Sequence, residues 1–194
     1  MALRTIRETR DPILRKKSKP VKEMTPRTQE LIDDLIENMH EADGVGLAAV
    51  QVGILKRIAV VWVPEPVLEE PEEGEEAEVE PESVNELTHS SGEEIVMVNP
   101  VWEPVGEELQ TDNEGCLSVP GKYGLVTRPE HIRLKALDRD MKPYEREAMG
   151  LLARAICHEC DHMDGILYTD KVEGELHDSR VDAEDEDDPE GYIE

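Results

Sequence analysis

The sequence predicts a single α+β domain, in which antiparallel or mixed β-sheets pack around a long C-terminal helix. Short apolar segments at 58–63 and 95–98 are typical of buried strands, and alternation at 132–137 is typical of a half-buried strand. An amphipathic segment at 147–165 follows them, and its apolar residues recur at helical spacing. Strands followed by one long helix are typical of an α+β architecture, and 194 residues suffice for one hydrophobic core.

The N-terminal region contains the signals of two helical segments. Residues 11–15 (Asp-Pro-Ile-Leu-Arg) predict a short helical turn. Thr25 and Pro26 are typical of an N-cap and a first helical position. Apolar residues at a helical period then predict a helix that ends near Glu41, before Asp43 and Gly44; they are Leu31, Ile32, Leu35, Ile36 and Met39.

Three further segments have weaker signals. Residues 44–53 contain three glycines among small apolar residues, which fits either a buried strand or a backbone that approaches a ligand closely. Gln51 is a polar amide in these surroundings, so it requires a hydrogen-bonding partner. Residues 113–121 predict a strand that enters a turn. Residues 166–168 predict a short closing strand.

Most of the net charge of −26 belongs to two segments. Residues 64–94 hold thirteen glutamates and no Lys or Arg, and residues 178–194 hold nine acidic groups and one arginine. The first segment predicts a disordered acidic insertion in a domain of residues 1–170, and residues 171–194 predict an acidic C-terminal tail. A partner-binding arm is the less favoured interpretation. Dense negative charge repels phosphates, so we expect no direct binding of nucleic acid.

Composition also predicts the compartment. The sequence has no twenty-residue apolar run that would span a membrane and no apolar signal core at its N-terminus. Its three cysteines are too few for a disulfide framework, and in an intracellular setting cysteines favour metal-binding or catalytic uses. We therefore expect a cytoplasmic protein.

The segment His158-Glu159-Cys160-Asp161-His162 carries the strongest chemical signal. Positions four apart on a helix are offset by only about 40° around its axis, so His158 and His162 project from one face. Two imidazoles so placed can bind one metal ion, and Glu159 can reach a water molecule on that ion. The predicted C-terminal helix is therefore a metal-binding helix.

Other interpretations of this segment remain open from the residues alone. The histidines could be surface residues, or Cys157 and Cys160 could form a redox pair or half of a structural zinc site. A catalytic metal takes a third protein ligand, for which Cys116 is a better candidate than Glu173 or Glu175 in the acidic C-terminal region. A lone cysteine is nevertheless more often a small buried hydrophobe. We expect the remaining histidines on the surface; they are His40, His89, His131 and His177.

Three segments together resemble the signature motifs of the peptide deformylases, in the order in which that family has them. They are residues 44–53 (Gly-Val-Gly-Leu-Ala-Ala-Val-Gln-Val-Gly), 114–118 (Glu-Gly-Cys-Leu-Ser) and 158–162 (His-Glu-Cys-Asp-His). Residues 11–15 also resemble the N-terminal region of the family, and the resemblance covers most of residues 5–170. Three motifs in order are far more specific than any one of them.

The resemblance implies a metal-dependent hydrolase that removes the formyl group from N-formylmethionine of newly synthesised polypeptides. It implies Cys116, His158 and His162 as ligands of Fe²⁺, with Zn²⁺, Ni²⁺ or Co²⁺ also able to occupy the site. It further implies Glu159 as general base and acid. The remaining implied residues are the oxyanion donors Gln51 and Leu117, the substrate-binding residues Val45, Gly46, Leu151 and Ala155, and a structural ion pair of Glu114 with Arg128.

The sequence departs from the family pattern at several places. Tyr123 replaces a substrate-facing arginine of one branch, and Cys160 replaces a larger apolar residue. The insertion is longer than usual. Some family members dock on the ribosome through a basic C-terminal helix, which leaves transient ribosome association open, but the acidic tail here disfavours docking of that kind. Two other functions remain as alternatives. They are a metalloprotease of the His-Glu-x-x-His class and a metal-stabilised binding module that recruits a partner through its acidic segments.

Overall fold

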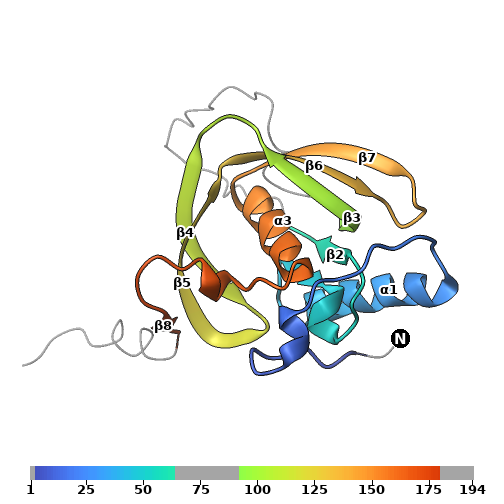
Figure 1. Ribbon diagram of the computed structural model, residues 1–194, viewed down its shortest axis with the longest axis horizontal. Coiled ribbons are helices and arrows are strands. Elements are labelled where there is room, and N and C mark those ends of the chain that lie inside the picture. Colours follow the sequence, from blue (N-terminus) through green and yellow to red (C-terminus); the bar gives the residue numbers. More distant parts are fainter. Residues whose placement is uncertain (1–2, 64–91, 180–194) are drawn as a thin grey trace, which may run out of the picture.

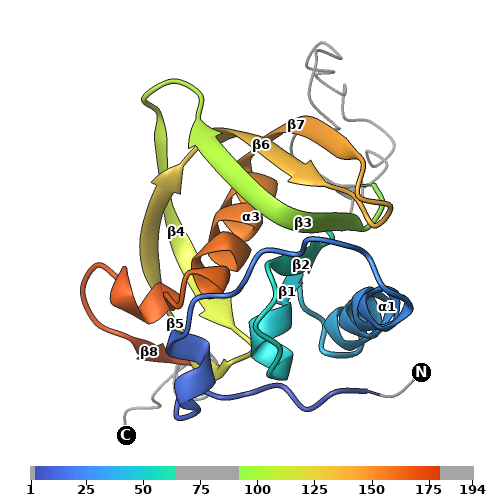
Figure 2. The same ribbon diagram turned by 45° about the vertical axis from the view of Figure 1, so that its right-hand side comes forward.

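The computed structural model describes residues 3–63 and 92–179, which form two antiparallel sheets with a helix between them (Figures 1 and 2). The five-stranded sheet has the order β1-β2-β3-β6-β7, and the three-stranded sheet has the order β4-β5-β8. The strands of the first sheet are β1 (Gly46–Ala48), β2 (Ile58–Val61), β3 (Ile95–Pro104), β6 (His131–Leu137) and β7 (Pro143–Met149). Those of the second are β4 (Leu109–Cys116), β5 (Val119–Pro129) and β8 (His177–Asp178). The predicted α+β fold is confirmed.

The five-stranded sheet is covered by a helix on each face, which explains why β2 is apolar throughout. Ile58 and Val60 belong to the core cluster beneath helix α1 (Pro26–Glu41). Ala59 and Val61 belong to the cluster beneath helix α3 (Gly150–Met163). A strand buried on both faces has no solvent side and therefore shows no polar alternation.

Helix α1 begins and ends as predicted. The Thr25 side chain accepts a hydrogen bond from the Thr28 backbone N–H, with Pro26 at the first helical position. Its buried apolar residues are Leu31, Ile32, Leu35 and Met39, which pack against the five-stranded sheet. The short turn predicted at 11–15 is the 3₁₀ helix η1 (Pro12–Arg15), capped by the Asp11 side chain.

Helix α3 starts three residues later than predicted. Residues 147–149 continue strand β7, where Met149 pairs with His131, and Gly150 then begins the helix with a φ of 52°. Gly165 has a φ of 78° just after the helix, and a β-carbon there would lie 2.7 Å from the Arg15 carbonyl oxygen. Glycine is thus required where the chain leaves the helix.

Other local predictions were corrected by the structure. The glycine-rich segment 44–53 is a strand only over β1, after which the 3₁₀ helix η2 (Ala49–Val52) follows. Residues 166–168 do not form a strand; the 3₁₀ helix η3 (Tyr168–Asp170) begins there, and the Asp170 side chain accepts a hydrogen bond from Leu167 N–H. Strands β5, β7 and β8 were not predicted.

The two acidic segments lie mostly beyond what the structure describes. Only the last three residues of the predicted insertion, 92–94, are among the described residues, and so are residues 171–179 of the predicted tail. Within the latter, β8 pairs with β5. In the described ranges, no helix is both long and apolar enough to cross a membrane.

Three of the four histidines predicted on the surface are described. His40 is exposed and pairs with Glu94, and His177 is exposed and stacks on Tyr123. His131 is only partly exposed and pairs with Glu147. His89 lies outside the described residues.

Candidate metal centre and adjoining pocket

Helix α3 and the end of strand β4 bring three metal-binding side chains together. Cys116, His158 and His162 each offer one ligand atom, and these atoms all lie within 4.8 Å of one another. The Cys116 Sγ and His162 Nε2 atoms are 3.2 Å apart. Glu173 and Glu175, the other candidates for the third ligand, are exposed and are not members of this cluster. One thiolate and two imidazoles match the ligand types that transition metals such as zinc and iron use.

His158 is oriented by a carboxylate on its far side. Its Nδ1 atom lies 2.9 Å from Glu114 Oε2, so that a proton on Nδ1 is donated to Glu114 and Nε2 remains available for a metal ion. Metal-binding histidines commonly have such a carboxylate partner, which selects the tautomer and the ring orientation. Glu114 is therefore part of the site, because it orients His158.

Glu114 is buried and accepts hydrogen bonds from two arginines as well. Arg128 binds it through two nitrogen atoms, each 2.8 Å from a carboxylate oxygen, and Arg154 adds a third bond of 2.8 Å. Burial by itself would raise the pKa of Glu114, but the hydrogen bonds from Arg128 and His158 hold this pKa well below its usual value. The ion pair between Glu114 and Arg128 that the family resemblance implied is present.

Two further charged residues that contact Glu114 or Arg128, Arg154 and Asp161, were not predicted from the sequence. Arg154 lies in α3 between two alanines, and Asp161 lies one residue before His162; both are at least nine-tenths buried. Asp161 accepts hydrogen bonds from Arg128, at 2.5 Å, and from Lys171. The signal that could have identified them was their charge within the apolar face of the helix, because a buried charged residue requires a buried partner.

Glu159 is almost completely buried and faces the pocket. Among the described residues, its Oε2 atom is one of four buried side-chain polar atoms that have no hydrogen-bond partner. Burial raises the pKa of Glu159 to about 7, because the charged form loses hydration. A carboxyl group with such a pKa can both accept and donate a proton near neutral pH.

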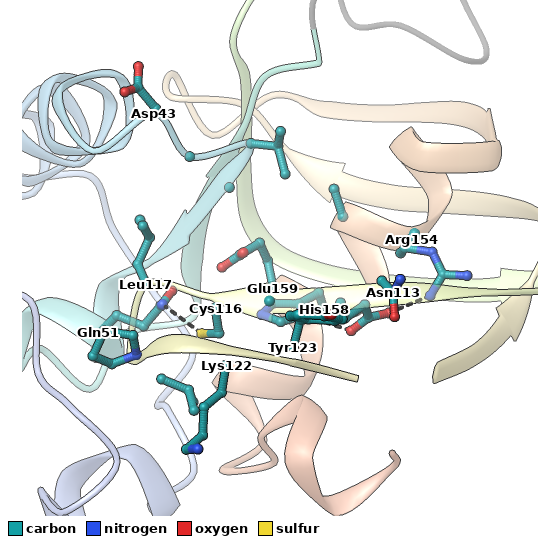
Figure 3. Close-up of a pocket in the computed structure, with 18 of the residues that line it drawn as sticks. Asp43, Gln51, Asn113, Cys116, Leu117, Lys122, Tyr123, Arg154, His158 and Glu159 are labelled. Atoms are coloured by element: carbon teal, nitrogen blue, oxygen red, sulfur yellow. Dashed lines mark hydrogen bonds and ion pairs between the residues drawn. The ribbon is translucent and has the colours of Figure 1, made fainter. Parts of the chain in front are cut away.

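Gln51 has the partner that its polar amide requires. Its Oε1 atom accepts a hydrogen bond of 2.8 Å from the Ala48 N–H, and its Nε2 atom donates to Ser118 Oγ at 3.2 Å. The same Nε2 atom lies 3.6 Å from Cys116 Sγ. The amide is therefore fixed with its N–H groups directed to the turn that carries Cys116 and Leu117 (Figure 3).

A pocket of about 540 Å³ opens beside the metal-binding cluster. Figure 3 shows Gln51 and Leu117 at one end of this pocket and Asn113 and Arg154 at the other, with Cys116, His158 and Glu159 between them. Its lining includes all four residues that the resemblance implied in substrate binding, namely Val45, Gly46, Leu151 and Ala155. Val45 and Leu151 are the exposed apolar side chains among these, and a concave apolar surface beside polar groups is typical of a ligand site.

The remaining two cysteines are free thiols in the core. Cys157 and Cys160 belong to the buried cluster between α3 and the five-stranded sheet. Burial raises the pKa of Cys157 to about 12 and also raises that of Cys160, so both favour the unreactive thiol form. This environment does not support the redox-pair interpretation.

A model of the family described as polypeptide deformylase matches residues 3–177 of the chain. The chain belongs to the polypeptide deformylase family. Similar relatives include the peptide deformylase of Lachnoclostridium phytofermentans, 46% identical over 96% of this chain and 99% of the relative. The peptide deformylase of Agathobacter rectalis is 50% identical over 92% and 95%, respectively.

Solved structures of this family have the same fold. A crystal structure of peptide deformylase from Ehrlichia chaffeensis superposes with a TM-score of 0.73 at 33% identity, covering 89% of each chain. The structure from Thermotoga maritima gives a TM-score of 0.73 at 30% identity, covering 90% of this chain and all of the other. This family member is thus a peptide deformylase by sequence and by fold, and it is an enzyme.

Proposed function

We propose that the protein releases formate from the N-formylmethionine of newly synthesised polypeptides in the cytoplasm. The observation that carries this proposal is the position of Glu159 beside the Cys116-His158-His162 cluster, in the lining of the apolar pocket. Glu159 is a buried carboxyl group, and one of its oxygen atoms has no hydrogen-bond partner. A hydrolase of a small amide requires these three parts: an activated water molecule, a proton carrier and a pocket that selects the substrate.

Cys116, His158 and His162 would hold the metal ion, and we propose Fe²⁺, with Zn²⁺, Ni²⁺ or Co²⁺ able to occupy the same site. When bound, the ion supplies acidification of a water molecule and polarisation of the formyl carbonyl. The spacing of the three ligand atoms and the carboxylate behind His158 support this assignment.

Glu159 would act as the proton carrier. In this role it takes a proton from the attacking water molecule and returns it to the amine that leaves. The raised pKa supports the role, because a carboxyl group with a pKa of about 7 has both its charged and its protonated form available near neutral pH. The charged form can accept a proton from water, and the protonated form can donate it to the amine.

Two donors would stabilise the negative charge that develops on the formyl oxygen. They are the backbone N–H of Leu117, immediately after Cys116, and the Nε2 group of Gln51. The Gln51 amide is preorganised, because the hydrogen bond from the Ala48 N–H already fixes its orientation before the substrate binds.

The methionine side chain would occupy the apolar pocket. Val45, Leu151 and Ala155 line the pocket from two elements, the segment before β1 and helix α3. Gly46 would offer its backbone to the substrate.

The decisive experiment measures formate release from a formyl-Met tripeptide by anaerobically purified, iron-loaded protein. We expect release by the parent protein and none by Glu159→Ala, which removes the proton carrier and leaves the three ligands in place. The unformylated tripeptide is the control, because cleavage of its peptide bonds would indicate a metalloprotease. Absence of formate with metal confirmed in the protein would contradict the proposed function and favour a metal-stabilised binding module.

A further inference from the structure

Arg154 is a buried charged residue that the proposed mechanism does not use. It lies on α3 one turn before His158, lines the pocket and is only 3% exposed. Its Nη1 atom donates to Glu114 Oε1 and to the Val126 carbonyl, each at 2.8 Å, and Nη2 donates to the Gln110 carbonyl at 3.2 Å. One guanidinium thus joins the helix that carries both metal-binding histidines to strands β4 and β5.

The two oxygen atoms of Glu114 accept hydrogen bonds from different sets of donors. Oε1 accepts from Arg128 Nε and Arg154 Nη1, while Oε2 accepts from Arg128 Nη2 and His158 Nδ1. Both oxygens therefore have two donors, which leaves the carboxylate no freedom to rotate. Without Arg154, Oε1 would lose one of its two donors, and Glu114 would be held by Arg128 alone on the side away from His158.

The same bond balances the buried charge. Arg128 is shared between two carboxylates, because its Nη1 atom donates to Asp161 while the other nitrogens bind Glu114. Arg154 supplies a second buried cation beside the two buried anions. Asp161 also pairs with Lys171, whereas removal of Arg154 would leave Glu114 with Arg128, a cation that it shares with Asp161. The less compensated carboxylate would draw the imidazole of His158 toward Glu114 and away from the metal.

We propose that Arg154 is a positioning residue of the metal centre, which acts through Glu114 to fix the orientation of His158. Two features of the guanidinium are required: its charge, which adds to that of Arg128 beside Glu114, and its planar fork, which reaches Glu114 and two backbone carbonyls at once. The inference rests on the proposed metal site. It predicts that Arg154 determines how firmly the metal is retained.

The test is the loss of Co²⁺ from protein loaded with Co²⁺, followed through the visible absorption of the bound ion after addition of a chelator. The parent protein is compared with Arg154→Met, Arg154→Lys, Glu114→Gln and the double variant Arg154→Met/Glu114→Gln. Arg133→Met is the matched control, because Arg133 forms ion pairs at the surface and is not among the residues that line the pocket. Thermal melting of each variant reports whether it folds.

We expect Arg154→Met to lose Co²⁺ about tenfold to a hundredfold faster than the parent, as is typical when a residue behind a metal ligand is removed. Its absorption band should also shift, whereas Arg133→Met should match the parent in both respects. In the Glu114→Gln background, Arg154→Met should have little further effect, because the residue through which it acts is already altered. Arg154→Lys should fall between the parent and Arg154→Met.

Several results would overturn the proposal. An unchanged rate and spectrum in Arg154→Met would do so, and so would independent, multiplicative effects of the two substitutions in the double variant. If Arg154→Met does not fold, Arg154→Lys decides: faster loss of Co²⁺ supports the proposal and an unchanged rate contradicts it. Because Co²⁺ retention is measured without substrate, a protein that retains Co²⁺ in an Arg154-dependent way but releases no formate would contradict only the proposed function.

Discussion

A β-carbon placed on Gly46 would lie 2.6 Å from Oε1 of Glu159. The two residues come from different elements, β1 and α3, and they approach so closely that only glycine leaves room for the carboxylate. The absence of a side chain at position 46 therefore leaves space for the Glu159 carboxylate.

Gly46→Ala should displace the Glu159 carboxylate and lower the turnover of a formyl-Met peptide by about a hundredfold or more, the scale of general acid–base catalysis. The three atoms nearest to the added β-carbon all belong to Glu159 and not to a ligand residue, so the metal content should stay equal to that of the parent. Formate release and metal analysis on the same sample check both statements. Normal turnover would show that Glu159 can move without loss and would weaken its proposed role.

Gln51→Leu should lower turnover by about a hundredfold, because one of the two proposed oxyanion donors is lost. The metal content should be retained, since Gln51 is not among the three ligand residues. Gln51 also accepts a hydrogen bond from Ala48 N–H, so the melting temperature is recorded as a control. Near-normal turnover would remove Gln51 from the mechanism.

Two adjacent leucines of α3 should separate stability from substrate binding. Leu152 is completely buried, and Leu152→Ala should lower the free energy of unfolding by about 2–5 kcal/mol. Leu151 is 49% exposed and lines the pocket, so Leu151→Ala should raise KM for formyl-Met peptides with little change in stability. Denaturant unfolding and steady-state kinetics of both variants measure the difference. A large loss of stability in Leu151→Ala would contradict this assignment.

Removal of the metal should lower the melting temperature. An ion present at a hundred times its dissociation constant stabilises the folded state by about 2.7 kcal/mol, which corresponds to about 5–10 °C for a domain of this size. Melting curves with and without a chelator measure this shift. In Cys116→Ala the chelator should have a much smaller effect, and an equal shift in that variant would exclude Cys116 as a ligand.

The sequence was most informative where local signals were sufficient. Thr25 and Pro26 define the start of α1 because capping depends on neighbouring residues only. The common face of His158 and His162 could also be predicted, because it requires only that the segment be helical. By contrast, Ala148 and Met149 fit the apolar pattern of a helix and of a strand, and their place in β7 is decided by pairing with β6.

Buried charge was harder to predict because it depends on partners that are distant in sequence. Arg154 lies 40 residues from Glu114, and Asp161 lies 33 residues from Arg128. Nothing near Arg154 in the sequence indicates that a carboxylate and two carbonyl groups lie opposite. The strand predicted at 166–168 was wrong for a similar reason. Asp170 caps η3 in this segment, and it is also held by an ion pair with Arg15, which is distant in the sequence.

The separation of Cys116 from the two histidines has a consequence for biosynthesis. Three strands, β5, β6 and β7, lie between them in the chain, and the histidines occupy α3, the second of the two α-helices in the described residues. A polypeptide on the ribosome that has grown past residue 116 but not yet to residue 158 has the thiol but neither imidazole, and hence one of the three candidate ligands. All three candidate ligands can meet one metal ion only after synthesis has passed His162 and α3 has docked between the sheets, so the centre is completed late in the synthesis of the domain.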